Sequence, residues 1–175
     1  MKSKILLLLA MVGITLSSCD LTGEANYTPL IFPYISTGDS LSLYYTDIAN
    51  VFRMDTINVG DTVSFYLQMT GVENNLTAFY LTQSADSAAK IILPDKNSMD
   101  SIFLSSSDYK TGKFFMKGTS TDLFFPFKYI ARKQSNEAKL TFTIVSDAKF
   151  NDSYIGTNSS TLTIKTPIVE KLVSE

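Results

Sequence analysis

One residue in this chain, a cysteine, carries a reactive thiol at a position where that thiol could be chemically modified. Cys19 is the only cysteine, and it follows an apolar run at 5–16 that begins after the basic residues Lys2 and Lys4. A basic head, a short apolar core and small residues at the end are typical of an export signal. The run is shorter than the about 20 apolar residues that span a bilayer. In an exported protein, a lone thiol would stand unpaired in an oxidising compartment unless it were modified.

The four residues Leu16-Ser17-Ser18-Cys19 resemble the lipobox of bacterial lipoproteins. The resemblance implies cleavage before Cys19 and attachment of acyl chains, such as palmitate, to its thiol and to its new amino group. Two or more chains anchor a protein stably in a membrane. An ordinary signal peptide that ends near a cysteine is the alternative. The expected location is a bacterial cell envelope, at the outer membrane, with the periplasmic or surface face left open.

These features divide the chain into four parts. We expect a lipoprotein signal peptide at 1–18, a lipidated tether at 19–26, one domain at 27–168 and a C-terminal tail at 169–175. Without Lys2 and Lys4, 13 of the 15 basic residues remain against 17 acidic ones, a net charge of −4. Nucleic acids select a basic face, so the composition argues against nucleic-acid binding.

Composition also removes most catalytic chemistry. The chain has no histidine, and its only thiol is assigned to lipid, so the usual zinc, copper and haem ligand sets are excluded. Ser-His-Asp and Cys-His catalysis are excluded for the same reason. Carboxylate pairs could still act on glycosides, but the candidates lie in or beside turns with nothing to mark two of them as partners: Glu73, Asp108, Asp122 and Glu137. We therefore predict no enzyme activity and no cofactor.

A calcium loop is the nearest match to a metal site. Asp95, Asn97 and Asp100 have the spacing of oxygen ligands, but the glycine and the bidentate glutamate of an EF-hand are missing. We predict no bound metal.

A short motif, Asp-Ser or Asp-Thr followed by an apolar residue, occurs five times. It resembles the O-glycosylation acceptor of exported Bacteroidota proteins, and the resemblance implies five candidate hydroxyls: Ser40, Thr56, Thr62, Ser87 and Ser101. The structural alternative is that a turn aspartate begins many strands.

Strand patterns fill the rest of the chain. Apolar and polar residues alternate along 63–69 and 140–145, and about ten such segments are separated by turn residues. Pro33 indicates an edge strand, and Pro126 predicts that strand 123–132 is at an edge or bulged. Further strands are predicted at 101–104 and 113–117. No segment after the signal shows a helical period.

This pattern favours a two-sheet β-sandwich, with a β-barrel as the alternative. The run Asp-Thr-Ile-Asn-Val-Gly-Asp-Thr-Val at 55–63 resembles the opening of bacterial immunoglobulin-like domains, where a short first strand turns into the second. The run Leu-Thr-Phe-Thr-Ile-Val at 140–145 resembles the penultimate strand of the same family. The resemblance implies an all-β, immunoglobulin-like sandwich, with a strand pair around the turn at 59–61.

The resulting functional expectation is a lipid-anchored, non-catalytic envelope module that binds a glycan or a protein partner. Exposed aromatic residues could stack on sugars, and Tyr44, Tyr45, Tyr66 and Phe124 are the candidates. The alternative is a structural subunit of a fimbrial or other surface assembly. The chain resembles lipid-anchored pilins, which mature by cleavage after an arginine, and Arg53 is one of only two arginines.

Overall fold

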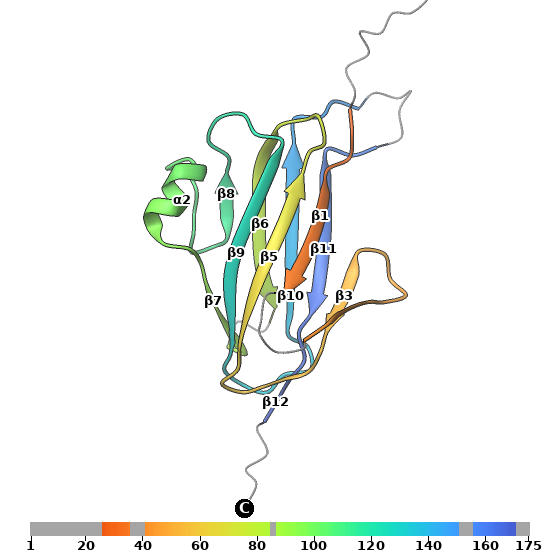
Figure 1. The fold of residues 1–175 in the computed structure, drawn as a ribbon, viewed down its shortest axis with the longest axis vertical. Coiled ribbons are helices and arrows are strands. Elements are labelled where there is room, and N and C mark those ends of the chain that lie inside the picture. The colour runs from red at the N-terminus through yellow and green to blue at the C-terminus, as the bar shows by residue number, and fades with distance from the viewer. Residues whose placement is uncertain (1–25, 36–40, 85–86, 151–155, 171–175) are drawn as a thin grey trace, which may run out of the picture.

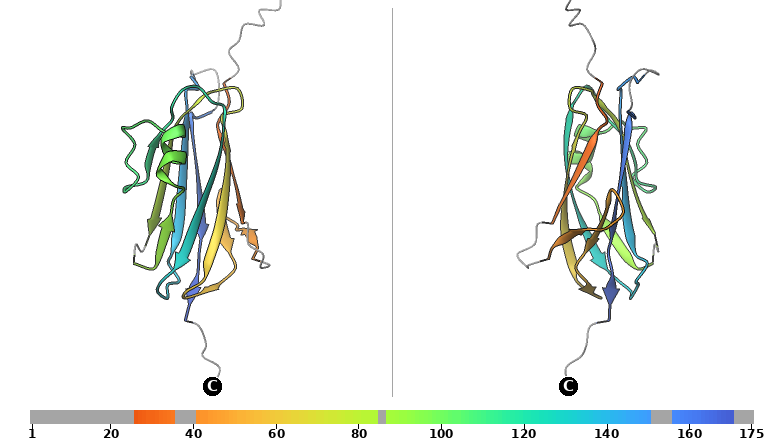
Figure 2. Two further views of the ribbon diagram at one scale, coloured as in Figure 1. Left: turned by 60° about the vertical axis from the view of Figure 1, so that its left-hand side comes forward. Right: turned by 90° about the vertical axis from the view of Figure 1, so that its right-hand side faces the viewer.

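The computed structural model of this protein describes residues 26–35, 41–84, 87–150 and 156–170. Within these ranges the chain forms twelve strands and one short helix. The strands are arranged as two sheets packed face to face, with the helix on one side (Figures 1 and 2). The fold is therefore a sandwich, and the barrel alternative is wrong.

The first sheet has four strands, and all neighbours are antiparallel. Its order across the sheet is β1 (Leu30–Ile35), β5 (Thr62–Thr70), β9 (Asp122–Ala131) and β7 (Ala89–Ile92). Pro33 lies in β1 at the edge of this sheet, which confirms the prediction from its missing N–H donor.

The second sheet has six strands. Its order is β2 (Leu43–Tyr45), β3 (Val51–Met54), β11 (Ser159–Lys165), β10 (Lys139–Ser146), β6 (Leu76–Ser84) and β8 (Lys113–Phe115). Only the β3–β11 pair is parallel among the named pairs of this sheet. A further parallel pair, β4 (Ile57–Asn58) with β12 (Ile168–Val169), lies at one end of the sandwich.

This connectivity is immunoglobulin-like. In that fold the first, second, fifth and fourth strands form one sheet, and the third, sixth and seventh form the other. Here β1, β5, β9 and β7 supply the first set, and β6, β10 and β11 supply the second. The chain departs from the simple fold in one respect. Segment 93–121, which holds helix α2 (Lys96–Ile102) and strand β8, is inserted between β7 and β9, where the simple fold has a hairpin.

Alternating side chains build the core between the sheets. Val63, Phe65, Leu67 and Met69 of β5 are fully buried, as their period of two predicted. Phe79 of the opposite sheet contacts Phe125 of β9 with ring centroids 5.0 Å apart. The core is therefore aromatic and closely packed.

Two local predictions were wrong. Residues 101–104 were expected to form a strand, but Ser101 and Ile102 end helix α2. Asp95 caps this helix, because its carboxylate accepts hydrogen bonds from the backbone N–H groups of Asn97 and Ser98. The predicted strand pair around 59–61 is also absent from the described residues. The turn itself is present at Gly60 (φ +97°), but β3 joins the six-stranded sheet and β5 the four-stranded one.

Pro126 required a different explanation from the predicted edge or bulge. β9 lies between β5 and β7, and its register with β5 is unbroken. The N–H of Ala131 donates to Asp61 on the β5 side. Because backbone groups alternate in direction along a strand, the Pro126 nitrogen points to the β7 side. The last β7 pair is Ile92 with Lys128, so no ladder bond is lost at Pro126.

Candidate binding face

The outer surface of the four-stranded sheet carries an unusual number of aromatic rings. Alternation along each strand sends one set of side chains into the core and the other set outward. The outward set includes six apolar side chains from three adjacent strands, which we call the aromatic face: Leu30, Phe32, Tyr34, Tyr66, Phe124 and Pro126.

Strand register places all of these side chains except Leu30 in two rows. Phe32, Gln68 and Phe124 are aligned across β1, β5 and β9. Tyr34, Tyr66 and Pro126 form the next row. Neighbouring strands lie about 4.8 Å apart, and residues two positions apart in one strand are separated by about 6.8 Å. The two rows therefore form a continuous patch about 10 Å wide across the strands.

Polar groups sit within and beside this patch. The Gln68 side-chain amide lies between the Phe32 and Phe124 rings in register. Its Oε1 accepts a hydrogen bond from the Tyr34 hydroxyl at 3.5 Å. Thr70 and Ser64 flank Gln68 and Tyr66 on the same face of β5, and Lys128 follows Pro126 on β9. The face thus offers both aromatic surfaces and hydrogen-bonding groups.

The rings on this face are open to solvent. Phe124 is 62% exposed and Tyr34 is 51% exposed, whereas Phe125 and Phe127 of the same strand are almost fully buried. Isolated exposed apolar residues are normal, but a contiguous patch is typical of an interaction site. Aromatic rings with nearby polar groups can stack on the apolar face of a ligand and bind its hydroxyl or amide groups. The arrangement is therefore suited to binding a ligand.

Two of the six residues of the aromatic face were predicted from the sequence. Tyr66 and Phe124 lie on it, two residues apart in register across β5 and β9. Tyr44 and Tyr45 do not, because β2 belongs to the other sheet. The Tyr45 ring instead packs on Phe52 at a centroid distance of 4.4 Å. Phe32 and Tyr34 were not predicted, although residues two apart in a strand lie on the same face.

The modification candidates are placed as follows. Cys19 and Ser40 lie outside the described residues. Thr56, Thr62, Ser87 and Ser101 are exposed. The Ser101 hydroxyl donates to the Ser98 carbonyl within helix α2. Asp61, which precedes Thr62, accepts the Asn58 N–H at 2.8 Å, so this copy of the motif also builds a turn.

Three of the carboxylates considered for calcium or glycosidase chemistry, Asp95, Asp100 and Asp108, take part in local structure. The hydroxyl and N–H of Ser98 hold the pKa of Asp95 below its usual range. Lys96 lowers the pKa of Asp100 by a hydrogen bond within their ion pair, and Tyr109 adds a second one. Hydrogen bonds from Thr111 likewise lower the pKa of Asp108. No cluster of three potential metal ligands occurs among the residues that the structure describes.

No helix in the described ranges is long and apolar enough to cross a membrane.

The fold and this face define an immunoglobulin-like β-sandwich with an exposed aromatic sheet surface. No protein-family model matches the chain, and no curated protein matches it. Among solved structures, the ASH/PapD-like domain 7 of human CEP192 is similar, at 7% identity over 89% of this chain and 98% of that one, with a TM-score of 0.40.

Domains 4 and 5 of the S-layer protein SbsC are similar at 13% identity and a TM-score of 0.31. The match covers 78% of this chain and spans about half of that structure (54%). Both TM-scores lie below 0.5, so nothing about the function of this chain follows from either likeness.

Proposed function

We propose that this protein is a lipid-anchored, non-catalytic module of a bacterial cell envelope, and that it binds a glycan through its aromatic face. The observation that carries the binding proposal is the patch of exposed rings formed by β1, β5 and β9. Sugar rings present C–H faces that stack on aromatic rings, and hydroxyl groups that Gln68 and its polar neighbours can bind.

The membrane proposal rests on the lipobox resemblance at Cys19 and on the start of the folded region. The Tyr27 N–H donates to Asn74 at 2.9 Å, and Asn26 accepts from the Lys149 N–H at 2.7 Å. These bonds tie the start of the domain to the β5–β6 turn and to the segment that follows β10. Seven residues from Cys19 to Asn26 reach at most about 25 Å, so lipidation would hold the domain close to its membrane.

A glycan array followed by titration calorimetry tests the binding proposal, using full-length protein in neutral detergent. Tyr66→Ala and Phe124→Ala each remove one ring from the face. A ring contact contributes about 0.5–1.5 kcal/mol beyond area burial, so each variant should weaken the best array hit by roughly two- to tenfold. Tyr44→Ala is the matched control, because Tyr44 is equally exposed (52%) but lies on the other sheet. Absence of any glycan signal, or equal weakening by the control, contradicts the proposal.

Metabolic labelling with a fatty-acid analogue tests the anchor separately. Wild-type protein should carry the label and sediment with membranes. Cys19→Ser should lose the label and either keep its signal peptide or appear as a soluble exported protein. The lipoprotein proposal is contradicted if the wild type carries no label, or if the variant is labelled as strongly as the wild type.

A second proposal is a subunit of a surface assembly. The observation that favours it is that β1 is an edge strand, so removal of the chain up to Arg53 would leave the β5 edge open for a strand from a neighbour. Arg53 itself is paired with both Tyr44 and Lys165 inside the sheet, so cleavage requires β3 to unpair first. Treatment with an arginine-specific protease decides the matter: cleavage at Arg53 followed by polymerisation supports assembly, and an intact monomer contradicts it.

A further inference from the structure

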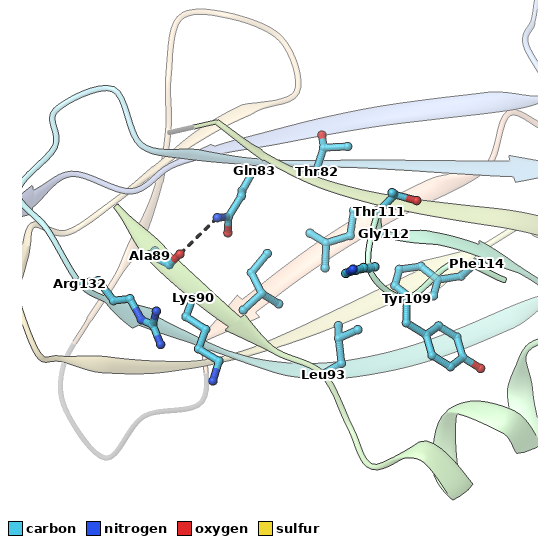
Figure 3. Close-up of a pocket in the computed structure, with 13 residues that line it drawn as sticks. Thr82, Gln83, Ala89, Lys90, Leu93, Tyr109, Thr111, Gly112, Phe114 and Arg132 are labelled. Carbon is cyan, nitrogen blue, oxygen red and sulfur yellow. Dashed lines mark hydrogen bonds between the residues drawn. The ribbon is translucent and has the colours of Figure 1, made fainter. Parts of the chain in front are cut away.

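A cleft of about 710 Å³ opens along one side of the sandwich, between β7 and residues 109–114 of the insertion (Figure 3). The insertion is held against β6 by a backbone bond from the Leu81 N–H to the Gly112 carbonyl, at 2.9 Å. Gly112 has φ +68°, and a Cβ there would lie 1.9 Å from the Leu81 oxygen. Only glycine permits this approach, so the wall of the cleft is a built feature of the fold.

The inner walls of the cleft are apolar. Leu81 and Phe114 are buried, and Ile91 and Leu93 are partly buried beside them. Tyr109 and Phe114 stand together at one end (Figure 3), with ring centroids 5.8 Å apart. The Tyr109 hydroxyl donates to Asp100 at 2.9 Å, which fixes the ring against helix α2. The interior can therefore accept an apolar side chain.

One edge of the cleft is the strand edge of β7, where the Ala89 carbonyl accepts a hydrogen bond from the Gln83 side chain at 3.2 Å (Figure 3). Lys90 and Ile92 of β7 are paired with Ile130 and Lys128 of β9 and direct their backbone groups to that strand. Backbone groups alternate in direction, so the N–H and C=O of Ile91 point to the cleft. No strand of the described residues pairs with β7 on this side. An extended peptide could add to the sheet here.

The rim of the cleft is basic. Lys90 and Arg132 lie close together at the end opposite Tyr109 (Figure 3), and Lys110 also lines the cleft. All three side chains are exposed, and none of the described residues that line the cleft is acidic. Acidic groups near Tyr109 are already engaged, since Asp100 pairs with Lys96.

We propose that this cleft binds an extended segment of an acidic partner protein, added as a strand beside β7. In a strand, successive side chains point to opposite faces. Apolar residues of the segment would enter between the sheets beside Leu81 and Phe114, and the intervening acidic residues would meet Lys90, Arg132 and Lys110. The ligand is thus a peptide in which apolar and acidic residues alternate. This site is independent of the aromatic face and of its glycan.

A blocked seven-residue peptide of alternating glutamate and valine is the probe, and the matching lysine–valine peptide is its control. Fluorescence anisotropy is measured on full-length protein in neutral detergent at low salt. The glutamate peptide should bind more tightly than about 1 mM, and the lysine peptide should not. Lys90→Glu combined with Arg132→Glu should weaken binding at least about tenfold. Lys149→Glu combined with Lys165→Glu makes the same charge change away from the cleft and should leave binding unchanged.

Amide hydrogen exchange locates the bound peptide. The Ile91 amide should exchange more slowly when the glutamate peptide is present, because strand addition gives that N–H a partner. Four results overturn the proposal: no binding below about 1 mM, equal binding of the lysine peptide, equal weakening by the control variant, and binding without protection of the Ile91 amide.

Discussion

A buried hydrogen bond joins β9 of one sheet to the residue that follows β11 of the other, and its removal gives a quantitative test of the structure. The Tyr129 hydroxyl of β9 and the Thr166 hydroxyl, which follows β11, lie 2.8 Å apart. Both residues are buried, with exposed fractions of 1% and 0%. A buried hydroxyl that loses its only partner costs about 1–3 kcal/mol, whereas removal of both partners can be nearly neutral.

We therefore expect Tyr129→Phe and Thr166→Val each to lower the free energy of unfolding by about 1–3 kcal/mol. At about 2–4 °C per kcal/mol for a domain of this size, Tm should fall by roughly 2–12 °C. The double variant should lose much less than the sum of the two single losses. The coupling energy from the double-mutant cycle should be about 1–3 kcal/mol.

Urea unfolding followed by near-ultraviolet circular dichroism measures these free energies, since tyrosine is abundant and tryptophan is absent. Equal slopes in all four proteins are required for the comparison. Additive losses in the double variant would show that the two hydroxyls do not depend on each other, and the cross-sheet bond would then be refuted.

Three other predictions concern single features. Burial raises the pKa of Tyr129 above its ordinary value of 10.0. The contribution of its neutral hydroxyl to the free energy of unfolding should therefore be fully present below pH 10 and be lost as pH rises further. Alkaline unfolding curves should show a smaller loss for Tyr129→Phe. Val72 is a β-branched residue at φ +64° in an exposed turn, so Val72→Gly should raise the free energy of unfolding by about 1 kcal/mol in urea titration. Gly112→Ala should lower Tm, because the new methyl group would clash with the Leu81 carbonyl, and it should also abolish binding of the glutamate–valine peptide; an unchanged Tm contradicts the close approach.

Sequence reasoning reached the features that depend on neighbours along the chain. The period of two in β5 and β10 placed their buried residues correctly, and Pro33 marked an edge. Helix α2 was missed because it has seven residues and only Met99 is buried, so no helical period could develop. Its capping aspartate, Asp95, was the one available signal.

The binding surfaces were less accessible because they depend on pairing between distant strands. Tyr66 and Phe124 were recognised as exposed aromatic residues, but a sequence does not state which strands become neighbours. Phe32 joins them only because β1 pairs with β5. The cleft likewise exists because the insertion returns to β6 after β7 has crossed to the other sheet.

The parallel pairing of β3 with β11 determines the order in which the domain can be completed. Val51 pairs with Thr163, so β3 cannot form this pair until β11, more than 100 residues later, is available. A protein that emerges from the ribosome with its N-terminus first can pair β1 with β5 early, but its six-stranded sheet stays incomplete until β11 has been synthesised. The long loop that this contact closes also slows folding. If the protein is exported as proposed above, such a delay would leave the chain unfolded for passage through a membrane translocation channel.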